Sequence, residues 1–594
     1  MSSETALLLL PPARPNRPPD EVTVGEAFQH EIELLELYAN SVTRNGRDIE
    51  HPVRTCPLLS DFSNATLPRE DFSAMLQHDI AQRAQPGQAS HADTKGAQKL
   101  LKGFSKTDYA QEIIIEQGGK RYSRWEYLTD IFADLSLVER SAESNRRLPA
   151  PGKSTELLAI VSGHDIGPVK NKYLWLEPSA ITPPAAIERL FDTENGESAN
   201  PKAALIKAVE KLDSLMHPPE NEQSILRNIH DAESFYAPLC EYFGWDGLAT
   251  ALRNWSNIIR LQKSGHGVFI TKAEEIIQGL GSRAETLGSI EGLLGKLALG
   301  DVVVDQAFRD TTGHGITLGT AEIGVFSSIS GSETYTAARA IWRIKSVGSL
   351  AIKLLSDHKE LMWKSDIEQR AGLADTALIP ADLLAMTIVA EDQSLVAKLF
   401  AEATMAIAHD DELSFIGAPR RPEAIHIKGS EDFVQSMMGA LSLHPENLDE
   451  DGNPIISRKD VDIPKKPEDY HVGKQTCMYE GRRYEIQFQT EAGRRDARIG
   501  ISAHVLYKLL KQLEDYGGKD DDYAKIISDL AHTSVSAMQK IHEYGKVLGS
   551  RELLNPYGSR SRSFRKRIAD VSPGATALDW QVILRAVKRG QQHT

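Results

Sequence analysis

Apolar residues recur at steps of three and four along several stretches of the first half of the chain, which is the spacing of a helix that buries one face. This pattern predicts helices at 28–42, 66–79, 201–217 and 233–255. The segment between the second and third of these is polar and dotted with glycine and proline, and loops are expected in it at 89–97 and 146–155. We therefore expect a helical domain at 21–256 with an insertion at about 84–200.

From residue 338 onward the pattern changes, because helical stretches now alternate with short strands. Helices are expected at 338–355, 397–408 and 503–516, and strands at 383–390, 423–429 and 482–490. This alternation predicts a mixed sheet with helices packed on it, at 337–510. The glycine-rich segment 257–336 is expected to be a connector, and 511–594 to be helical with a basic tail. The expected fold class is α+β, with an all-α domain first and a mixed-sheet domain second.

Composition narrows the class of protein. The chain has 594 residues, 41% of them hydrophobic and 25% charged, as in a globular protein of several domains. Its three cysteines have no metal-binding spacing, so a reducing cytoplasmic location is expected. The apolar run near the N-terminus is short and broken by prolines, so we expect a disordered tail at 1–20 and no membrane association.

The net charge of −15 argues against nucleic-acid binding over the whole surface. A local basic stretch, SRSRSFRKR at 559–567, remains a candidate RNA contact, and a solvated tail is the alternative.

The strand expected at 482–490 presents one carboxylate, Glu485, on a definite face among cationic neighbours. The stretch that begins with Glu485, EIQFQTEAGRRDARIGISAH, resembles a block of the RelA/SpoT family. That block is E-V/I-Q-I-R-T, followed by a helix with the motif G-V/I-A-A-H. Three further stretches resemble motifs of the same family. RIKSVGSLAIK at 343–353 is similar to R-x-K-x-x-x-S-x-x-x-K, DLLAMTIV at 382–389 to D-L-x-G-x-R, and PEDYHVGKQT at 467–476 to N-G-Y-x-S-I-H.

RelA/SpoT proteins make and degrade the alarmone (p)ppGpp, and the resemblance implies a nucleotidyltransferase-like synthetase domain that moves pyrophosphate from ATP to the 3′-hydroxyl of GDP or GTP. The residues that the resemblance implies are as follows: Asp382 and Glu485 for catalysis and Mg²⁺; Arg343, Lys345, Ser349 and Lys353 for ATP; Tyr470, Lys474, Gln487 and His504 for the acceptor nucleotide.

These residue types suit that chemistry. Transfer of a phosphoryl group needs charge neutralisation and positioning more than covalent catalysis. On the helix expected at 338–355, Arg343 and Lys353 fall near one face and can line a triphosphate. Two carboxylates suit Mg²⁺ that is held mainly by phosphates and water, and Glu485 can accept the proton of the attacking hydroxyl.

The first half resembles the HD-type hydrolase domain of the same family. The segments RNGRDIEHPV, LQHDIAQ, LIKAVEKLDSLMH and AESFYAPLCEYFGW carry this resemblance. It implies Arg44 as a nucleotide-binding residue, and His51, His78, Asp79 and Glu210 as metal ligands. Imidazole and carboxylate ligands together suit a divalent metal such as Mn²⁺.

Departures from the family pattern leave three functions open. Gln82 and Arg83 stand where the family has the Glu-Asp pair that handles the attacking water, so the hydrolase half is expected to be degenerate. In the second half, Thr387 and Gln489 replace arginines, and Lys474 stands where the family has a histidine. The alternatives to a synthetase are therefore a nucleotide or alarmone sensor that regulates a protein partner, and a pyrophosphokinase that acts on RNA. A second His-Asp pair, His164 and Asp165, is expected in a loop, and the alternative is that this pair is the metal-binding His-Asp motif.

Overall fold

The structure is a computed structural model. It describes residues 28–41, 50–63, 69–86, 91–117, 120–145, 191–192, 197–198, 201–242, 245–297, 299, 301–304, 310–311, 316–329, 332–357, 380, 382–416, 424–463 and 471–494. The described residues up to Leu252 form one compact unit, and those from Arg253 form a second. Helices and a mixed sheet together agree with the expected α+β class.

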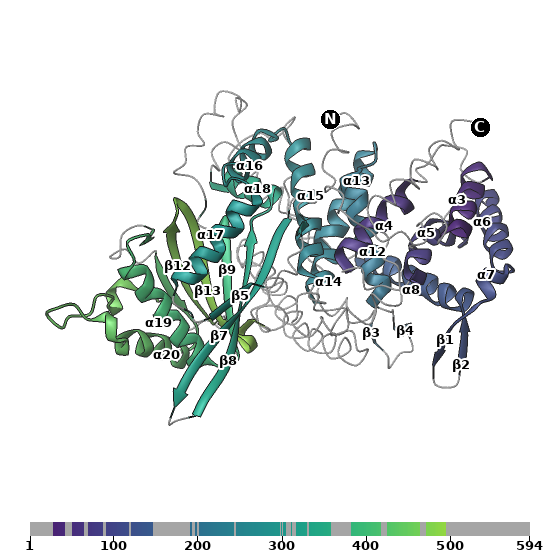
Figure 1. Ribbon diagram of the computed structural model, residues 1–594. Helices are drawn as coiled ribbons and strands as arrows, with labels where there is room; N and C mark the ends of the chain where they lie inside the picture. The colour runs from purple at the N-terminus through teal and green to yellow at the C-terminus, as the bar shows by residue number, and fades with distance from the viewer. Residues whose placement is uncertain are drawn as a thin grey trace, which may run out of the picture. The chain divides into compact units, whose positions relative to one another are not determined.

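The first unit is mainly helical (Figure 1). Its helices are α3 (Gln29–Ser41), α4 (Glu50–Ser63), α5 (Arg69–Arg83), α6 (His91–Phe104), α7 (Asp108–Gln111), α8 (Arg124–Asn145), α12 (Pro201–Met216), α13 (Glu222–Asp231), the π-helical turn η1 (Ala232–Tyr236), α14 (Ala237–Tyr242) and the start of α15 (Asp246–Lys263). Two short hairpins accompany them, β1 (Ile113–Gln117) with β2 (Lys120–Ser123), and β3 (Phe191–Asp192) with β4 (Glu197–Ser198). Helix α12 packs against α4 and α8, and α5 packs against the same two helices.

The helices predicted at 28–42, 66–79 and 201–217 are confirmed as α3, α5 and α12. The loop predicted at 89–97 is wrong, because α6 begins at His91. The segment interpreted as an insertion also contributes α8, which packs directly on α5 and α12 and therefore belongs to the core of this unit. The loop predicted at 146–155, the tail at 1–20 and the pair His164 and Asp165 lie outside the described residues.

The second unit is built on a nine-stranded mixed sheet. Its main strands follow the order β10-β12-β13-β9-β8-β7-β5, with β11 also paired to β12 and β6 to β7. The strands are β5 (Asp301–Val304), β6 (Asp310–Thr311), β7 (Ile316–Ile329), β8 (Ser332–Ile344), β9 (Leu384–Ala390), β10 (Leu413–Phe415), β11 (Ile425–Lys428), β12 (Val472–Tyr479) and β13 (Arg482–Thr490). The β13–β9 pair is parallel, and the other pairs are antiparallel.

One face of this sheet is covered by helices. Helix α19 (Gln393–His409) packs on β9, β12 and β13, and α20 (Glu431–Leu443) packs on α19 and β11 (Figure 1). Along β13 the residues that alternate with Glu485, namely Tyr484, Ile486 and Phe488, are fully buried. Because successive side chains of a strand point to opposite faces, Glu485 and Gln487 lie on the face away from α19. We call this second face the polar face.

Helices α16 (Val268–Gln278), α17 (Arg283–Lys296) and α18 (Val347–Asp357) complete the described core, together with the single-turn helices η6 (Pro445–Asn447) and η7 (Arg458–Asp460). The strands predicted at 383–390, 423–429 and 482–490 are confirmed as β9, β11 and β13, and the helix predicted at 397–408 as α19. The helix predicted at 503–516 lies outside the described residues, as do 511–594 and the basic stretch 559–567.

Two predictions for this unit are wrong. The segment 338–355 is not one helix: β8 ends at Ile344, and α18 begins at Val347. Arg343 is therefore a strand residue and does not share a helical face with Lys353. The expected connector 257–336 contains α16, α17 and the strands from β5 to β7, and these strands belong to the sheet. Among the described residues, we find no helix that combines the length and the apolar character needed to cross a membrane.

A tight hairpin brings β12 and β13 together. Tyr479 pairs with Arg482, and the two residues between them, Glu480 and Gly481, have positive φ values of 48° and 73°. A two-residue turn with positive φ at both positions matches the right-handed twist of the strands, and glycine adopts it without steric cost. The turn sets the register in which Thr476 lies opposite Glu485.

Candidate functional sites

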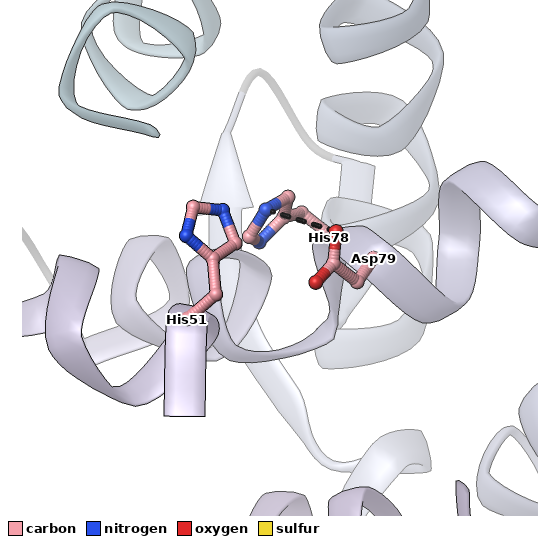
Figure 2. A group of neighbouring side chains, drawn as sticks. All are labelled: His51, His78 and Asp79. Atoms are coloured by element: carbon pink, nitrogen blue, oxygen red, sulfur yellow. Dashed lines mark ion pairs between the residues drawn. The ribbon is translucent and has the colours of Figure 1, made fainter. Parts of the chain in front are cut away.

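A cluster of imidazole and carboxylate groups lies in the helical unit. His51 comes from the first turn of α4, and His78 and Asp79 come from α5 (Figure 2). One ligand atom from each of the three residues lies within 4.8 Å of the others. The structure thus brings together, from α4 and α5, three of the four residues that the resemblance implies as metal ligands.

Glu210, the fourth nominated residue, approaches the cluster from α12. Its Oε2 lies 3.7 Å from His78 Nε2 and 2.5 Å from the ammonium group of Lys207. Burial would raise the pKa of the Glu210 carboxyl, but Lys207, His78 and His51 together outweigh burial and lower that pKa to about 2. Glu210 is therefore ionised and belongs to the same polar centre.

Asp213, one turn further along α12, was not among the predicted site residues. Its Oδ2 lies 2.6 Å from His51 Nδ1, and its carboxylate also accepts hydrogen bonds from the guanidinium of Arg54 at 3.0 and 3.1 Å. Burial opposes ionisation, but His217, His51 and Arg54 hold the pKa of Asp213 far below its usual range. A carboxylate that binds one nitrogen of a ligating histidine fixes the ring and directs the other nitrogen toward a metal.

The surroundings of the two histidines fit a divalent metal. His78 Nδ1 lies 2.5 Å from the carbonyl oxygen of Met75, and its buried Nε2 has no hydrogen-bond partner among the described residues. Burial would lower the pKa of His51, but the hydrogen bond with Asp213 and the neighbouring carboxylates raise it to about 9. Two imidazoles with oxygen ligands are a donor set that divalent Mn or Zn accepts. His51, His78, Asp79 and Glu210 would hold such an ion.

Gln82 lies one turn beyond His78 on α5, where the resembled family has an acid. Its amide nitrogen is 2.5 Å from Glu139 Oε1 of α8, and the other oxygen of Glu139 lies 3.6 Å from the ammonium of Lys207. These three side chains and His78 line a small cavity. The Gln82 amide is thus committed to a structural hydrogen bond, and an amide cannot accept a proton from water as a general base does.

The second candidate site lies on the sheet unit, around Asp382. Asp382 precedes β9, and its carboxylate is paired with two lysines: Lys345, which follows β8, and Lys353 of α18, at 2.7 Å. Burial would raise the pKa of Asp382, but the charges and hydrogen bonds of Lys345 and Lys353 together outweigh burial and lower that pKa to about 2. Ser349, near the start of α18, accepts a hydrogen bond from the Ser346 hydroxyl at 2.9 Å.

Glu485 is held in a similar way on the polar face of β13. Its Oε2 lies 2.8 Å from the ammonium of Lys474 on β12, and its Oε1 accepts a hydrogen bond of 2.7 Å from the Gln487 amide. The register places Glu485 beside Ala385 of β9, and Ala385 beside Arg343 of β8. Paired residues of neighbouring strands point to the same face. Arg343 and Glu485 therefore flank the small side chain of Ala385.

The structure brings together two groups of predicted residues in this unit. Lys345 and Lys353 meet Asp382, whereas Lys474 and Gln487 meet Glu485. Tyr470 and His504, expected at the acceptor, and Arg44, expected at the hydrolase centre, lie outside the described residues. The chain matches no model of a known protein family and no curated protein.

Proposed function

We propose that the sheet unit is a pyrophosphokinase of the RelA/SpoT type, which transfers the β,γ-pyrophosphate of ATP to the 3′-hydroxyl of GDP or GTP. The observation that carries this proposal is that each predicted catalytic carboxylate is paired with cations predicted to bind phosphate. Asp382 pairs with Lys345 and Lys353, and Glu485 pairs with Lys474. These pairings join residues from all four stretches that carry the resemblance, and this supports the proposal.

Substrate phosphates would compete for these lysines. A triphosphate has more negative charge than one carboxylate, so Lys345 and Lys353 would turn toward ATP and release Asp382. The released carboxylate, with Glu485, would then hold Mg²⁺ together with the phosphates. The ion would supply neutralisation of the charge that develops on the transferred group.

The acceptor would release Glu485 in the same manner. When Lys474 turns to the phosphates of GDP or GTP, Glu485 becomes available to accept the proton of the 3′-hydroxyl. The 3′-oxygen forms a bond to the β-phosphorus of ATP, the bond from that phosphorus to the α-phosphate oxygen breaks, and AMP leaves. Arg343, across Ala385 from Glu485, would bind the migrating phosphates from the other side. These substrates are cytoplasmic, and we propose that location.

For the helical unit we propose a metal-dependent alarmone-binding role without hydrolysis. The cluster of His51, His78 and Asp79 supports metal binding. The hydrogen bond of Gln82 to Glu139 argues against a catalytic base at that position. A sensor function of the whole chain, acting on a protein partner, is the alternative that this unit favours.

The deciding experiment is incubation of the full chain with Mg²⁺, labelled ATP and either GDP or GTP, followed by separation of the products. AMP and a guanosine with a 3′-pyrophosphate are expected in equal amounts. The Glu485→Ala variant should lose transfer by about 100-fold or more, since it lacks the base, while it still binds ATP.

Glu402→Ala is the matched control, because Glu402, on helix α19 of the same unit, is a glutamate that pairs with the side chain of His444 at 3.1 Å. It should turn over like the wild type. Equal activity of wild type and Glu485→Ala would contradict the assignment. Nucleotide binding without turnover would favour the sensor, and labelling of an RNA 3′ end instead of GDP would favour the RNA alternative.

A further inference from the structure

Strand β11 extends the polar face beyond Lys474. His426 lies directly opposite Lys474 in the β11–β12 register, and Lys474 lies opposite Gln487 of β13. Ile425 and Ile427, which alternate with His426, are buried on the side of helix α20. His426 and Lys428 are therefore on the polar face, next to the residues that hold Glu485.

A carboxylate orients the His426 ring. Its Nδ1 lies 2.8 Å from Asp462 Oδ2. Two backbone hydrogen bonds tie Asp462 to β11, from Asp462 N to the Ile425 carbonyl at 2.9 Å and from Ile427 N to the Asp462 carbonyl at 3.0 Å. Because the backbone fixes Asp462 beside the strand, the hydrogen bond to its carboxylate holds the imidazole in one orientation.

The charged residues of the polar face thus follow one another in a fixed sequence from β8 to β11 across the sheet. Arg343, Lys345 and Lys353 lie at the β8 side, Glu485 lies in the middle, and Lys474 lies between Glu485 and His426. Two strand spacings, about 10 Å, separate β13 from β11. A ribose whose 3′-hydroxyl lies at Glu485 would direct its 5′-phosphates toward β12 and β11.

We propose that His426, oriented by Asp462, and Lys428 bind the 5′-phosphates of the acceptor nucleotide. This inference rests on the proposed pyrophosphokinase function and adds two positioning residues outside the motifs of the resemblance. In those motifs a loop histidine meets the acceptor, and Lys474 stands in its place here. The imidazole is supplied instead by His426 on the neighbouring strand, directly opposite that lysine.

The test is calorimetric binding of GDP, guanosine and a non-hydrolysable ATP analogue to the full chain. In the wild type GDP should bind more tightly than guanosine. His426→Ala and Lys428→Ala should each weaken GDP binding about tenfold, because each loses a charge-assisted hydrogen bond to phosphate. Guanosine and the ATP analogue should bind as before, which loss of folding alone would not produce.

His444→Ala is the matched control, since His444 also pairs with a carboxylate, Glu402 at 3.1 Å, but on the helix-covered side of the sheet. It should leave all three affinities unchanged. If His426→Ala is unstable, His426→Gln keeps a polar side chain of similar size without the imidazole and should show the same selective loss.

The outcomes separate this inference from the function on which it rests. If the wild type makes product and the His426 and Lys428 variants bind GDP like the wild type, only the inference is wrong. If the variants lose guanosine and GDP binding equally, the residues support the fold and not the phosphates, which also overturns it. If the wild type binds neither ATP nor GDP, the proposed function itself fails.

Discussion

The buried Asp213 carboxylate stabilises the position of His51. It is almost fully buried, with 1% of its side chain exposed, and it contacts Arg54, His51 and His217. A buried carboxylate is stable only when its oxygens accept hydrogen bonds, so these three partners define one geometry. The orientation of the His51 ring therefore depends on Asp213 of α12 as well as on the backbone of α4.

We expect Asp213→Asn to weaken Mn²⁺ binding by roughly 10- to 100-fold, because asparagine lacks the negative charge and has only one acceptor oxygen for His51, Arg54 and His217. Calorimetric titration of the full chain with MnCl₂ measures this. Asp231→Asn is the control. Asp231 is equally buried and pairs with the ammonium group of Lys211 at a distance of 3.2 Å, and it is not part of the cluster of His51, His78 and Asp79. Equal losses in both variants would mean that the effect is one of folding.

The ionised carboxyls also set the response to acid. The pKa of Asp382 is lowered to about 2, against burial, chiefly by the charge of Lys345. A carboxyl whose pKa is lower in the folded state contributes stability above its ordinary value of about 4, and this stability is lost as the pH falls through about 2. Asp382 should thus contribute on the order of 2 kcal/mol at pH 7.

Urea unfolding of the full chain at pH 7, 4 and 2.5 checks this expectation, with Asp382→Asn for comparison. The free energy of unfolding should fall more steeply with acid in the wild type than in the variant. If the free energy of unfolding fell equally with pH in the wild type and in Asp382→Asn, the proposed contribution of Asp382 would be contradicted.

Individual site residues were predictable where a local pattern carried them. His78 and Asp79 are adjacent in the sequence, and Glu485 lies on a strand of clear alternation. Asp213 was missed because its role depends on Arg54 and His51, which lie about 160 positions away and meet it only in the folded chain. The one local signal was its spacing, since Lys207, Glu210 and Asp213 share a face of α12 at steps of three.

Among the elements, β8 differs most from its prediction. Its residues Ala338, Ala340 and Trp342 are buried, while Arg343 is exposed, so the period is two and not 3.6. The alanines at 338 and 340 also fit a helix, and the three- and four-step pattern of α18 continues the run. Pairing with both β7 and β9 decides in favour of the strand.

Close packing between β12 and the covering helices gives a prediction at this scale. A Cβ atom added at Gly473 would collide with Met437 of α20 and with the ring of Phe400 on α19. We expect Gly473→Ala to lower the free energy of unfolding by about 1–3 kcal/mol, since the core must shift to admit the methyl group.

The midpoint of urea unfolding of the full chain measures this change. Gly439→Ala is the matched control, because Gly439 lies on α20 with no atom within 4 Å of an added Cβ. It should be neutral or stabilising by up to about 1 kcal/mol, because alanine favours a helix. A loss of stability in the control as large as that in Gly473→Ala would contradict the packing argument.

For the whole molecule, each of the two units holds its own charged centre. The described residues divide into these units between Leu252 and Arg253, and the sequence-based boundary was expected near 256. The expected connector was misjudged because β5 is only four residues long and β7 contains Gly319 and Gly324, so the strand pattern of each is weak on its own. The partner strand of β7, β8, begins inside the segment and runs past its end at residue 336, so the sheet becomes visible only through pairing across the expected boundary.

The helical unit should bind metal without hydrolysis. Incubation of the full chain with Mn²⁺ and ppGpp should release no pyrophosphate, because Gln82 and Glu139 are engaged with each other at the position of the base. Ion chromatography of the products over several hours checks this, with Mn²⁺ binding measured on the same sample. Rapid release would show that another carboxylate activates the water.

The parallel pairing of β13 with β9 has a consequence for the order of folding. Leu384 pairs with Tyr484, one hundred positions further along the chain, whereas the β7–β8 and β12–β13 hairpins are local. Closing a long loop costs more entropy than closing a turn, so the hairpins form early and the union of β9 with β13 is the late step. Until then β9 presents an unpaired apolar edge, and the nascent chain is most exposed to aggregation while residues 471–494 are still being synthesised.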